Sequence, residues 1–273
     1  NVNYKGLGQF QWGEGLADFF FEEVEYPFFA HYLEGAPEKP AAVSLIPSFS
    51  DGEGHWEALK LDRMPAFKMM KLRLKNGRSR SSSYVSDPMK PLRYLHPSKT
   101  NVRDRSYMAD NFVDDSTAFV NFDYPAVEDT VFLCGPVDVD LRYRTTGEDL
   151  DFIVKVLDVA PDGKEMLIRG DVFRARYAHS FENPRFLRPN HRERLQFSMP
   201  EVVHYLLPGH SIRIQIQSTW FPLVDVNPQT AVPNIFKAEE SDYKAATVTI
   251  LHNFWSRSSV SIPVAEVIRQ DGI

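Results

Sequence analysis

The residue types of a hydrolase triad occur close together in the C-terminal third of the chain. Ser218, His210 and Asp225 could serve as nucleophile, general base and orienting acid. A chain with many residues of these types offers such a set by chance, so the pattern alone does not predict an active site. The nucleophile elbow Gly-x-Ser-x-Gly is absent from the sequence, as are a phosphate loop, a His-Glu-x-x-His helix and a dinucleotide fingerprint.

Two further sets could bind ions. His204 and His210 are possible metal ligands, although they flank a Pro208–Gly209 turn in which one strand leaves and another enters. Asp225 and Asn227 resemble a fragment of a calcium loop. Asp and Asn before a proline more often bond the backbone of a turn. We therefore expect no metal and no other cofactor.

The remaining reactive residues have simpler interpretations. Cys134 is the single cysteine, so no intrachain disulfide forms, and its Gly-Pro context favours a small buried residue. Six arginines lie between Arg174 and Arg194, with only Glu182 and Glu193 as local acids. They could form a patch for an anionic ligand, but ion pairing with acids elsewhere is favoured in a chain of net charge −6.

Tryptophan side chains could bind carbohydrate if they are exposed. Trp56, Trp220 and Trp255 are the candidates, and we keep Trp56 and Trp255 as candidate ligand-binding residues. Most tryptophans, however, lie in cores or interfaces.

The composition excludes several classes of protein. The chain of 273 residues carries 31 basic and 37 acidic residues, which gives no electrostatic case for nucleic acid or an anionic membrane as partner. No apolar stretch is long enough for a transmembrane helix, so we expect a soluble protein without membrane insertion. The compartment stays open between the cytoplasm and a periplasmic or secreted location. The chain begins at Asn1 without a signal peptide, so we expect it to be processed or part of something longer.

Apolar residues recur every three or four positions between Leu16 and Leu33, which predicts an amphipathic helix. Pro27 should kink or split this helix, and Gly35 and Pro37 should end it.

The rest of the chain reads as strands. Segments 41–49 and 68–75 are strand candidates, the second followed by an Asn76–Gly77 hairpin signal, and 78–83 is expected to be an exposed loop. Apolar and polar residues alternate over 137–144 and 212–217, as in half-buried antiparallel strands.

Two more strands complete the pattern. Residues 247–250 alternate in the same way, whereas 151–159 is apolar enough to be covered on both faces. Such strands, separated by proline and glycine turns, predict a mostly β protein with a β-sandwich.

Several ordered segments also resemble a known family. The longest runs from Pro208 to Thr230 and includes Trp220-Phe-Pro-Leu and Asn227-Pro-Gln-Thr. Segments 54–57, 84–91, 151–159 and 174–182 fit the same pattern. Together they resemble the C-terminal region of CocE/NonD serine hydrolases, a family related to cocaine esterase and X-prolyl dipeptidyl peptidase. The branch with α-amino acid ester hydrolases and glutaryl-7-aminocephalosporanic acid acylases is most similar.

The resemblance implies a jelly-roll β-sandwich, galactose-binding-like in fold, after a short helical remnant of an α/β-hydrolase domain. The boundaries it implies are 1–40 for the remnant and 41–273 for the sandwich. The family's catalytic serine, aspartate and histidine belong to the hydrolase domain, and no position here matches them. The chain alone is therefore expected to be inactive.

The expected function is that of a non-catalytic domain which packs on an α/β-hydrolase catalytic domain and shapes its active-site cleft. Trp220, Phe221 and Pro222 are the candidate contacts with that domain. A homo-oligomer is possible. The alternative is a free-standing carbohydrate- or peptide-binding sandwich module.

Overall fold

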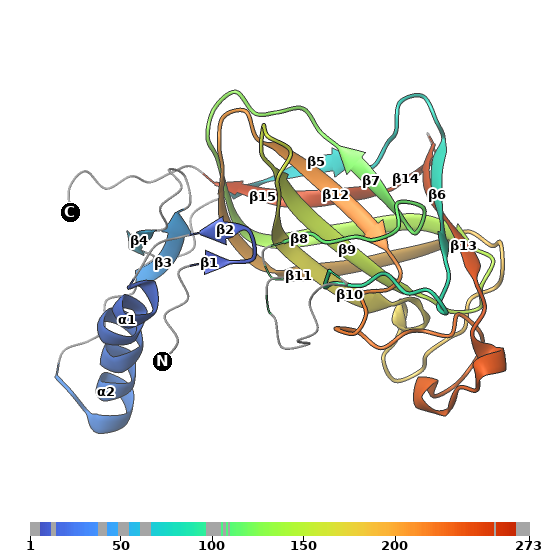
Figure 1. Ribbon diagram of the computed structural model, residues 1–273, viewed down its shortest axis with the longest axis horizontal. Helices are drawn as coiled ribbons and strands as arrows, with labels where there is room; N and C mark the ends of the chain where they lie inside the picture. The colour runs from blue at the N-terminus through green and yellow to red at the C-terminus, as the bar shows by residue number, and fades with distance from the viewer. Residues whose placement is uncertain are drawn as a thin grey trace.

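Two antiparallel sheets packed face to face form the body of the protein in the computed structural model (Figure 1). The structure describes residues 6–11, 15–37, 43–48, 55–60, 67–96, 105, 108, 110–253 and 255–265. The side chains of residues 6, 7, 11, 16, 43–48, 55–60 and 256 are not described. The predicted mostly β sandwich with a preceding helix is confirmed.

The larger sheet has seven strands, and the long strand β8 lies at its centre. One side of β8 pairs with β11, and the other pairs with β15 and then β13. Strand β5 pairs with β15, while β6 and β14 pair with β13. The strands are β5 (Phe67–Arg73), β6 (Ser81–Ser86), β8 (Val131–Thr145), β11 (Glu193–Leu206), β13 (Ala246–Asn253), β14 (Ser256–Arg257) and β15 (Ser259–Ala265).

The smaller sheet has four strands in the order β10-β9-β12-β7. They are β7 (Phe119–Asp123), β9 (Asp151–Val159), β10 (Glu165–Arg174) and β12 (Ser211–Gln217). Short 3-10 turns follow in the connections: η3 (Ala175–Tyr177), η4 (Ile235–Lys237) and η5 (Glu240–Asp242).

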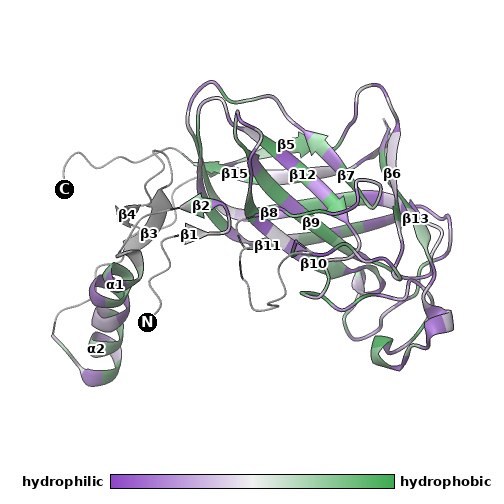
Figure 2. Ribbon diagram, viewed as in Figure 1, coloured by the Kyte–Doolittle hydropathy of each residue, from purple (hydrophilic) through white to green (hydrophobic). Residues whose placement is uncertain are grey.

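Alternating side chains build the core between the two sheets. Val137, Val139 and Leu141 of β8 point inward, as do Ile212 and Ile214 of β12. Figure 2 shows this alternation of hydrophobic and hydrophilic residues along the strands. Strand β9 is buried on both faces, as its continuous apolar pattern predicts. Its inner face belongs to the core, and its outer face is covered by loops.

The predicted N-terminal helix is present as three consecutive segments: α1 (Leu16–Phe20), the π-helical η1 (Phe21–Glu25) and α2 (Tyr26–Glu34). Pro27 lies in the first turn of α2 and lacks an N–H group, and the π segment immediately before it widens the turn. The backbone stays helical at Phe20, Glu25 and Tyr26, so the helix continues through Pro27 with a change of hydrogen bonding and is not split there. Gly35 ends it in a left-handed conformation, as expected.

Two short hairpins lie near this helix (Figure 1). They are β1 (Gly6–Leu7) with β2 (Phe10–Gln11), and β3 (Val43–Ser48) with β4 (His55–Lys60). Strand β3 lies within the predicted 41–49 strand. In the described part of the chain, no helix is long and apolar enough to cross a membrane.

Two expectations for the segment after β5 were wrong. Gly77 makes a turn, but β5 and β6 do not form a hairpin, because β5 pairs with β15 and β6 pairs with β13. Residues 81–83 belong to β6 rather than to an exposed loop. Cross-strand hydrogen bonds hold this serine-rich strand, with Ser83 Oγ 2.9 Å from Thr249 Oγ1. Polar pairs of this kind leave no hydrophobic pattern in the sequence.

Candidate functional site

A corner formed by residues 220–224 follows strand β12. Trp220 is only 7% exposed and packs with Tyr94, Leu95 and Ile153 in a small core on the outer face of the four-stranded sheet. Phe221 is 40% exposed, and Pro222, joined to it by a cis peptide bond, is also exposed. Of the three predicted contact residues, Trp220 therefore anchors the corner, whereas Phe221 and Pro222 face outward.

A strap formed by residues 87–96 fixes the backbone of the corner. The Phe221 N–H donates to the carbonyl of Leu92 at 2.8 Å, and the Tyr94 N–H donates to the carbonyl of Phe221 at 3.0 Å. The Leu92 N–H also donates to Thr219 Oγ1 at 2.8 Å. The strap and the corner thus form one unit, although they lie about 130 residues apart in the sequence.

An apolar groove of about 590 Å³ opens beside this unit. Its lining includes Met89, Phe221 and Phe236 together with the acids Asp225 and Glu240. Phe236 is 79% exposed and Met89 is 55% exposed. Clustered apolar side chains at such exposure mark an interaction surface more often than a monomer surface.

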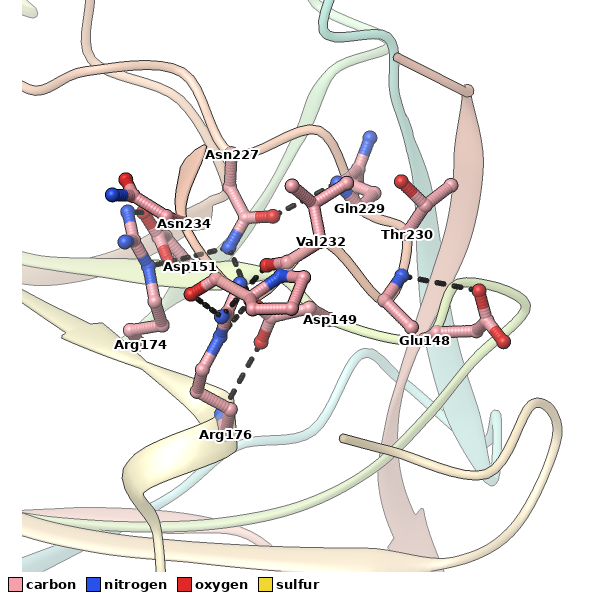
Figure 3. A network of polar contacts seen from close by, with 12 residues as sticks. Glu148, Asp149, Asp151, Arg174, Arg176, Asn227, Gln229, Thr230, Val232 and Asn234 are labelled. Atoms are coloured by element: carbon pink, nitrogen blue, oxygen red, sulfur yellow. Dashed lines mark hydrogen bonds and ion pairs between the residues drawn. The ribbon is translucent and has the colours of Figure 1, made fainter. Parts of the chain in front are cut away.

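A buried polar network secures the loop that carries this groove (Figure 3). Arg176 Nε donates to Asp149 Oδ2 at 2.7 Å, and both side chains are almost fully buried. Arg174 makes a two-bond contact with Asp151, each bond 2.8 Å long. Two Asp-Arg pairs therefore lie side by side: Asp151 begins β9 and Arg174 ends β10, while Asp149 precedes β9 and Arg176 lies in η3.

Asn227 joins these two pairs to the loop. Its Nδ2 donates to both Asp149 and Asp151 at 2.9 Å, and its Oδ1 accepts the N–H of Gln229 at 2.8 Å. Arg176 Nη1 also donates to the carbonyl of Val232 at 2.9 Å. Residues 227–233 are thereby fixed at the end of the sandwich.

Burial raises the pKa of Asp149, and the hydrogen bonds from Asn227 and Arg176 oppose that rise. The favoured interpretation of the arginine cluster, ion pairing with acids elsewhere in the chain, is confirmed for three of the six. Besides these two pairs, Arg194 contacts Asp140, whereas Arg185 contacts Glu193, an acid within the cluster itself.

A second groove, of about 340 Å³, borders the corner at Val224. Phe173, Tyr177 and Phe181 line it, and the Arg174–Asp151 pair also contributes to it. The rings of Tyr177 and Phe181 stack with centroids 5.8 Å apart, and Phe181 is largely exposed.

The residues of the possible triad are not brought together. Ser218 follows the end of β12 and His210 precedes its start, so the length of a seven-residue strand separates them. Ser218 Oγ lies 2.7 Å from the hydroxyl of Tyr84, and Asp225 lines the first groove. The arrangement cannot act as a nucleophile and base.

His204 and His210 lie close together, and both contact the carboxylate of Asp158. Nε2 of His204 lies 2.8 Å from one oxygen of Asp158, and Nδ1 of His210 lies 2.7 Å from the other. Among the described residues, no group of three suitable side chains could hold a metal ion. Asn227 uses its oxygen on a backbone N–H, in the turn geometry that we weighed against calcium.

The remaining candidates lie in separate places. Trp255 is 86% exposed at the turn between β13 and β14, whereas the side chain of Trp56 in β4 lies outside the described residues. Cys134 is buried, as expected, and burial raises the pKa of its thiol. The sequence does not single out the exposed groove residues Met89, Phe181 and Phe236, because isolated apolar residues in loops have no periodicity.

Comparison with known proteins covers most of the chain. Residues 58–253 match the family described as the X-Pro dipeptidyl-peptidase C-terminal non-catalytic domain. Cocaine esterase from Rhodococcus sp. (strain MB1 Bresler) is 25% identical over 178 residues, which are 65% of this chain and 31% of the esterase.

Two solved structures are similar over nearly the whole chain. An α-amino acid ester hydrolase is 31% identical, with a TM-score of 0.83 over 97% of this chain and 48% of that one. An aminopeptidase from a marine sediment archaeon, Thaumarchaeota archaeon, is 26% identical, with a TM-score of 0.82 over 97% of this chain and 47% of that one. The chain therefore spans about half the length of these two proteins, and it belongs to the family of X-Pro dipeptidyl-peptidase C-terminal non-catalytic domains.

Proposed function

We propose that this chain is the accessory domain of a serine ester or amide hydrolase, and that it packs on an α/β-hydrolase catalytic domain and shapes the rim of its active-site cleft. The length of its relatives supports this. Nearly all of the chain aligns with less than half of an ester hydrolase and of an aminopeptidase, which leaves room for a second large domain. The acyl group that such an enzyme prefers would depend largely on that second domain.

The groove beside the corner is the observation that carries the proposed contact. Met89, Phe221 and Phe236 contribute exposed apolar side chains to its lining, and Asp225 and Glu240 add negative charge. Its occupant in this proposal is a segment of the catalytic domain with an apolar side chain flanked by a basic residue. Apolar burial would supply affinity, and opposite charge would set the orientation.

The N-terminal helix supplies a second candidate contact. Phe21, Phe28 and Tyr32 are among its exposed aromatic side chains, and none of the described side chains of η1 and α2 is buried. Figure 1 shows the helix and the η4–η5 loop at opposite ends of the sandwich. A catalytic domain that contacts both would extend along the length of the sandwich, consistent with the proposed domains 1–40 and 41–273.

The first experiment measures the intact mass of the native protein in its source cells with an antibody to this chain. A species much heavier than 31.3 kDa supports a linked catalytic domain. A native species of 31.3 kDa without a co-purifying hydrolase contradicts the proposal.

The contact is then tested in the native protein with the double variant M89S/F236S, with W255S on the distant β13–β14 turn as control. We expect the double variant to lower esterase or amidase activity and the melting temperature of the longer protein, and W255S to change neither. The same double variant in the 273-residue chain should keep its stability, because both side chains are exposed. Unchanged activity and melting in the longer protein would argue against docking at this groove.

The second groove favours one alternative, a free-standing carbohydrate-binding module. Aromatic walls can pack on the apolar face of a sugar, and the Arg174–Asp151 pair offers both donors and acceptors to hydroxyl groups. Calorimetric titration with a broad glycan panel tests it. Binding that F181A abolishes would support this function, and no heat with any glycan would exclude it.

A further inference from the structure

A lysine is buried directly beneath the corner. Lys155, in the middle of β9, is 1% exposed, and its Nζ lies 4.8 Å from the centroid of the Trp220 ring. Nζ donates a hydrogen bond to Asn111 Oδ1 at 3.0 Å. An ammonium group has three N–H donors, and the described residues provide this single hydrogen-bond acceptor and the ring face.

A glycine makes room for the ring above the amine. Gly170 is the partner of Lys155 in the neighbouring strand β10. A Cβ atom at this position would lie 3.0 Å from Cη2 of Trp220 and 3.5 Å from Cγ of Lys155. Because Gly170 has no side chain, the Trp220 ring can pack directly over Lys155.

The surrounding charges do not neutralise the amine directly. On the sheet face that holds Lys155, the strand register places the charged groups Asp151 of β9, Glu165 and Arg174 of β10, Arg213 of β12 and Asp123 of β7, and Asp151 and Arg174 pair with each other. Asp110 of the segment before β7 and Arg93, Tyr94 and His96 of the strap are the titratable groups beside this face. Arg93 and His96 are exposed, and Asp110 accepts the N–H of Gln9 at 2.9 Å.

Glu165 is the carboxylate linked to Lys155, and Asn111 lies between them. Asn111 Nδ2 donates to Glu165 Oε2 at 2.5 Å, while Glu165 Oε1 pairs with Arg213. Burial therefore outweighs the attraction of Glu165 and lowers the pKa of Lys155 to about 7.

We propose that the corner is a pH-sensitive lid, and that protonation of Lys155 favours an open form in which Trp220 leaves its seat and the ammonium group reaches water. Phe221 and Pro222 directly follow Trp220 in the chain, so movement of Trp220 would also displace these two exposed residues of the corner. This last step rests on the proposed function: docking of a catalytic domain on the closed corner would weaken as the pH falls, and docking would in turn favour the neutral amine.

The direction follows from two opposing effects. A pKa lowered from 10.5 to about 7 corresponds to a roughly 3000-fold preference of the charged amine for water. The attraction of a desolvated ammonium for an aromatic ring opposes opening by about 30-fold. Opening is therefore favoured on protonation. From pH 9 to pH 6 the opening constant should rise by about 90-fold, or by about 4-fold if the full ring attraction applies.

Hydrogen exchange of this 273-residue chain tests the lid without any catalytic domain. The amide groups of Tyr94 and Phe221 report on opening because they hydrogen-bond the strap to the corner. After correction for intrinsic rates, their exchange should accelerate by about 4- to 90-fold from pH 9 to pH 6. The Ile214 amide in β12 serves as the internal reference. The variant K155M, which keeps an unbranched apolar side chain under Trp220, should abolish the pH dependence.

A pH dependence that persists in K155M, or none in the wild type, overturns the proposal. NMR titration of the Lys155 side chain gives a second reading that needs no variant. A pKa between about 7 and 8.5 supports the lid, and an ordinary value near 10.4 refutes it. The lid could open at pH 6 while the catalytic domain of the native longer protein docks equally well at pH 6 and pH 9. That result would support the lid and refute the proposed regulation of docking.

Discussion

Replacing Arg176 by methionine should destabilise the protein more than any other single change in the polar network. Arg176 and Asp149 are buried together, so the substitution leaves a carboxylate in the interior without its cation. Asp149 would keep the hydrogen bond from Asn227. Losing one partner of a buried ion pair costs about 3–5 kcal/mol, which is roughly a 1000-fold change in the folding equilibrium.

Urea unfolding at pH 7, followed by circular dichroism, measures this loss. Arg174 provides a matched control two residues earlier, because its side chain is 23% exposed and Asp151 keeps the hydrogen bond from Asn227. We expect R174M to cost about 1–2 kcal/mol. The double variant D149N/R176M should recover at least about 2 kcal/mol of the loss in R176M, because no charge is then left unpaired.

The pH dependence supplies an independent check of the same reasoning. The pKa of Asp149 is raised in the folded protein, and Arg176 acts to lower it, so its removal should raise that pKa further. A group with a raised pKa when folded binds protons more tightly in the folded state, so acidification toward its pKa is stabilising. The deficit of R176M relative to the wild type should therefore shrink below pH 7. A loss under about 1 kcal/mol, or one that R174M equals, would refute the account.

Three other substitutions test separate parts of the structure. K155M should raise the free energy of unfolding near pH 6, with about 5 kcal/mol as the upper bound from its pKa of about 7. Because that pKa lies below the unfolded value, wild-type stability should rise with pH between about 7 and 10.5, and the variant should lose this slope in urea titrations. G147A should cost about 2 kcal/mol in thermal melts, since its Cβ would lie 2.8 Å from the carbonyl oxygen of Gln229; no change in melting temperature would contradict this. Y143F should be neutral or stabilising by about 1 kcal/mol, because the described residues offer the buried hydroxyl of Tyr143 no hydrogen-bond partner; a clear loss of stability would reveal one.

Strands that bury one face were predictable from the sequence, and strands that rely on polar pairing were not. The alternation in β8 and β12 and the continuous apolar run of β9 match the observed burial. Residues 81–83 of β6 were assigned to a loop because serines at these positions bond across to β13 instead of filling the core. The Asn76–Gly77 turn was correctly located, but a turn residue does not specify which strands pair on either side of it.

The polar network was predictable in kind but not in detail. Ion pairing of the arginine cluster followed from charge balance, yet nothing local indicates that Arg176 pairs with Asp149, 27 residues earlier in the chain. Asn227 was placed in a turn, and this was correct, but its contacts to Asp149 and Asp151 span more than 70 residues. The β9–β10 register places Arg174 beside Asp151, and the loop after β12 brings Asn227 to both acids, so these contacts follow from the fold rather than from spacing along the chain.

The segments that resemble the family also bear on the proposed interface, because their polar residues shape the end of the sandwich where it would lie. The segments that resemble the family contain four polar residues that form hydrogen bonds within the domain: Arg174, Arg176, Asn227 and Gln229. Their joint effect is to hold residues 220–233 rigidly at one end of the sandwich, where Phe221 borders both an apolar groove and the strap. In the proposed docking, a rigid loop would have little entropy left to lose, so these polar residues would contribute to binding indirectly. Substitutions of the buried residues Asp149, Arg176 or Asn227 should therefore weaken the proposed docking.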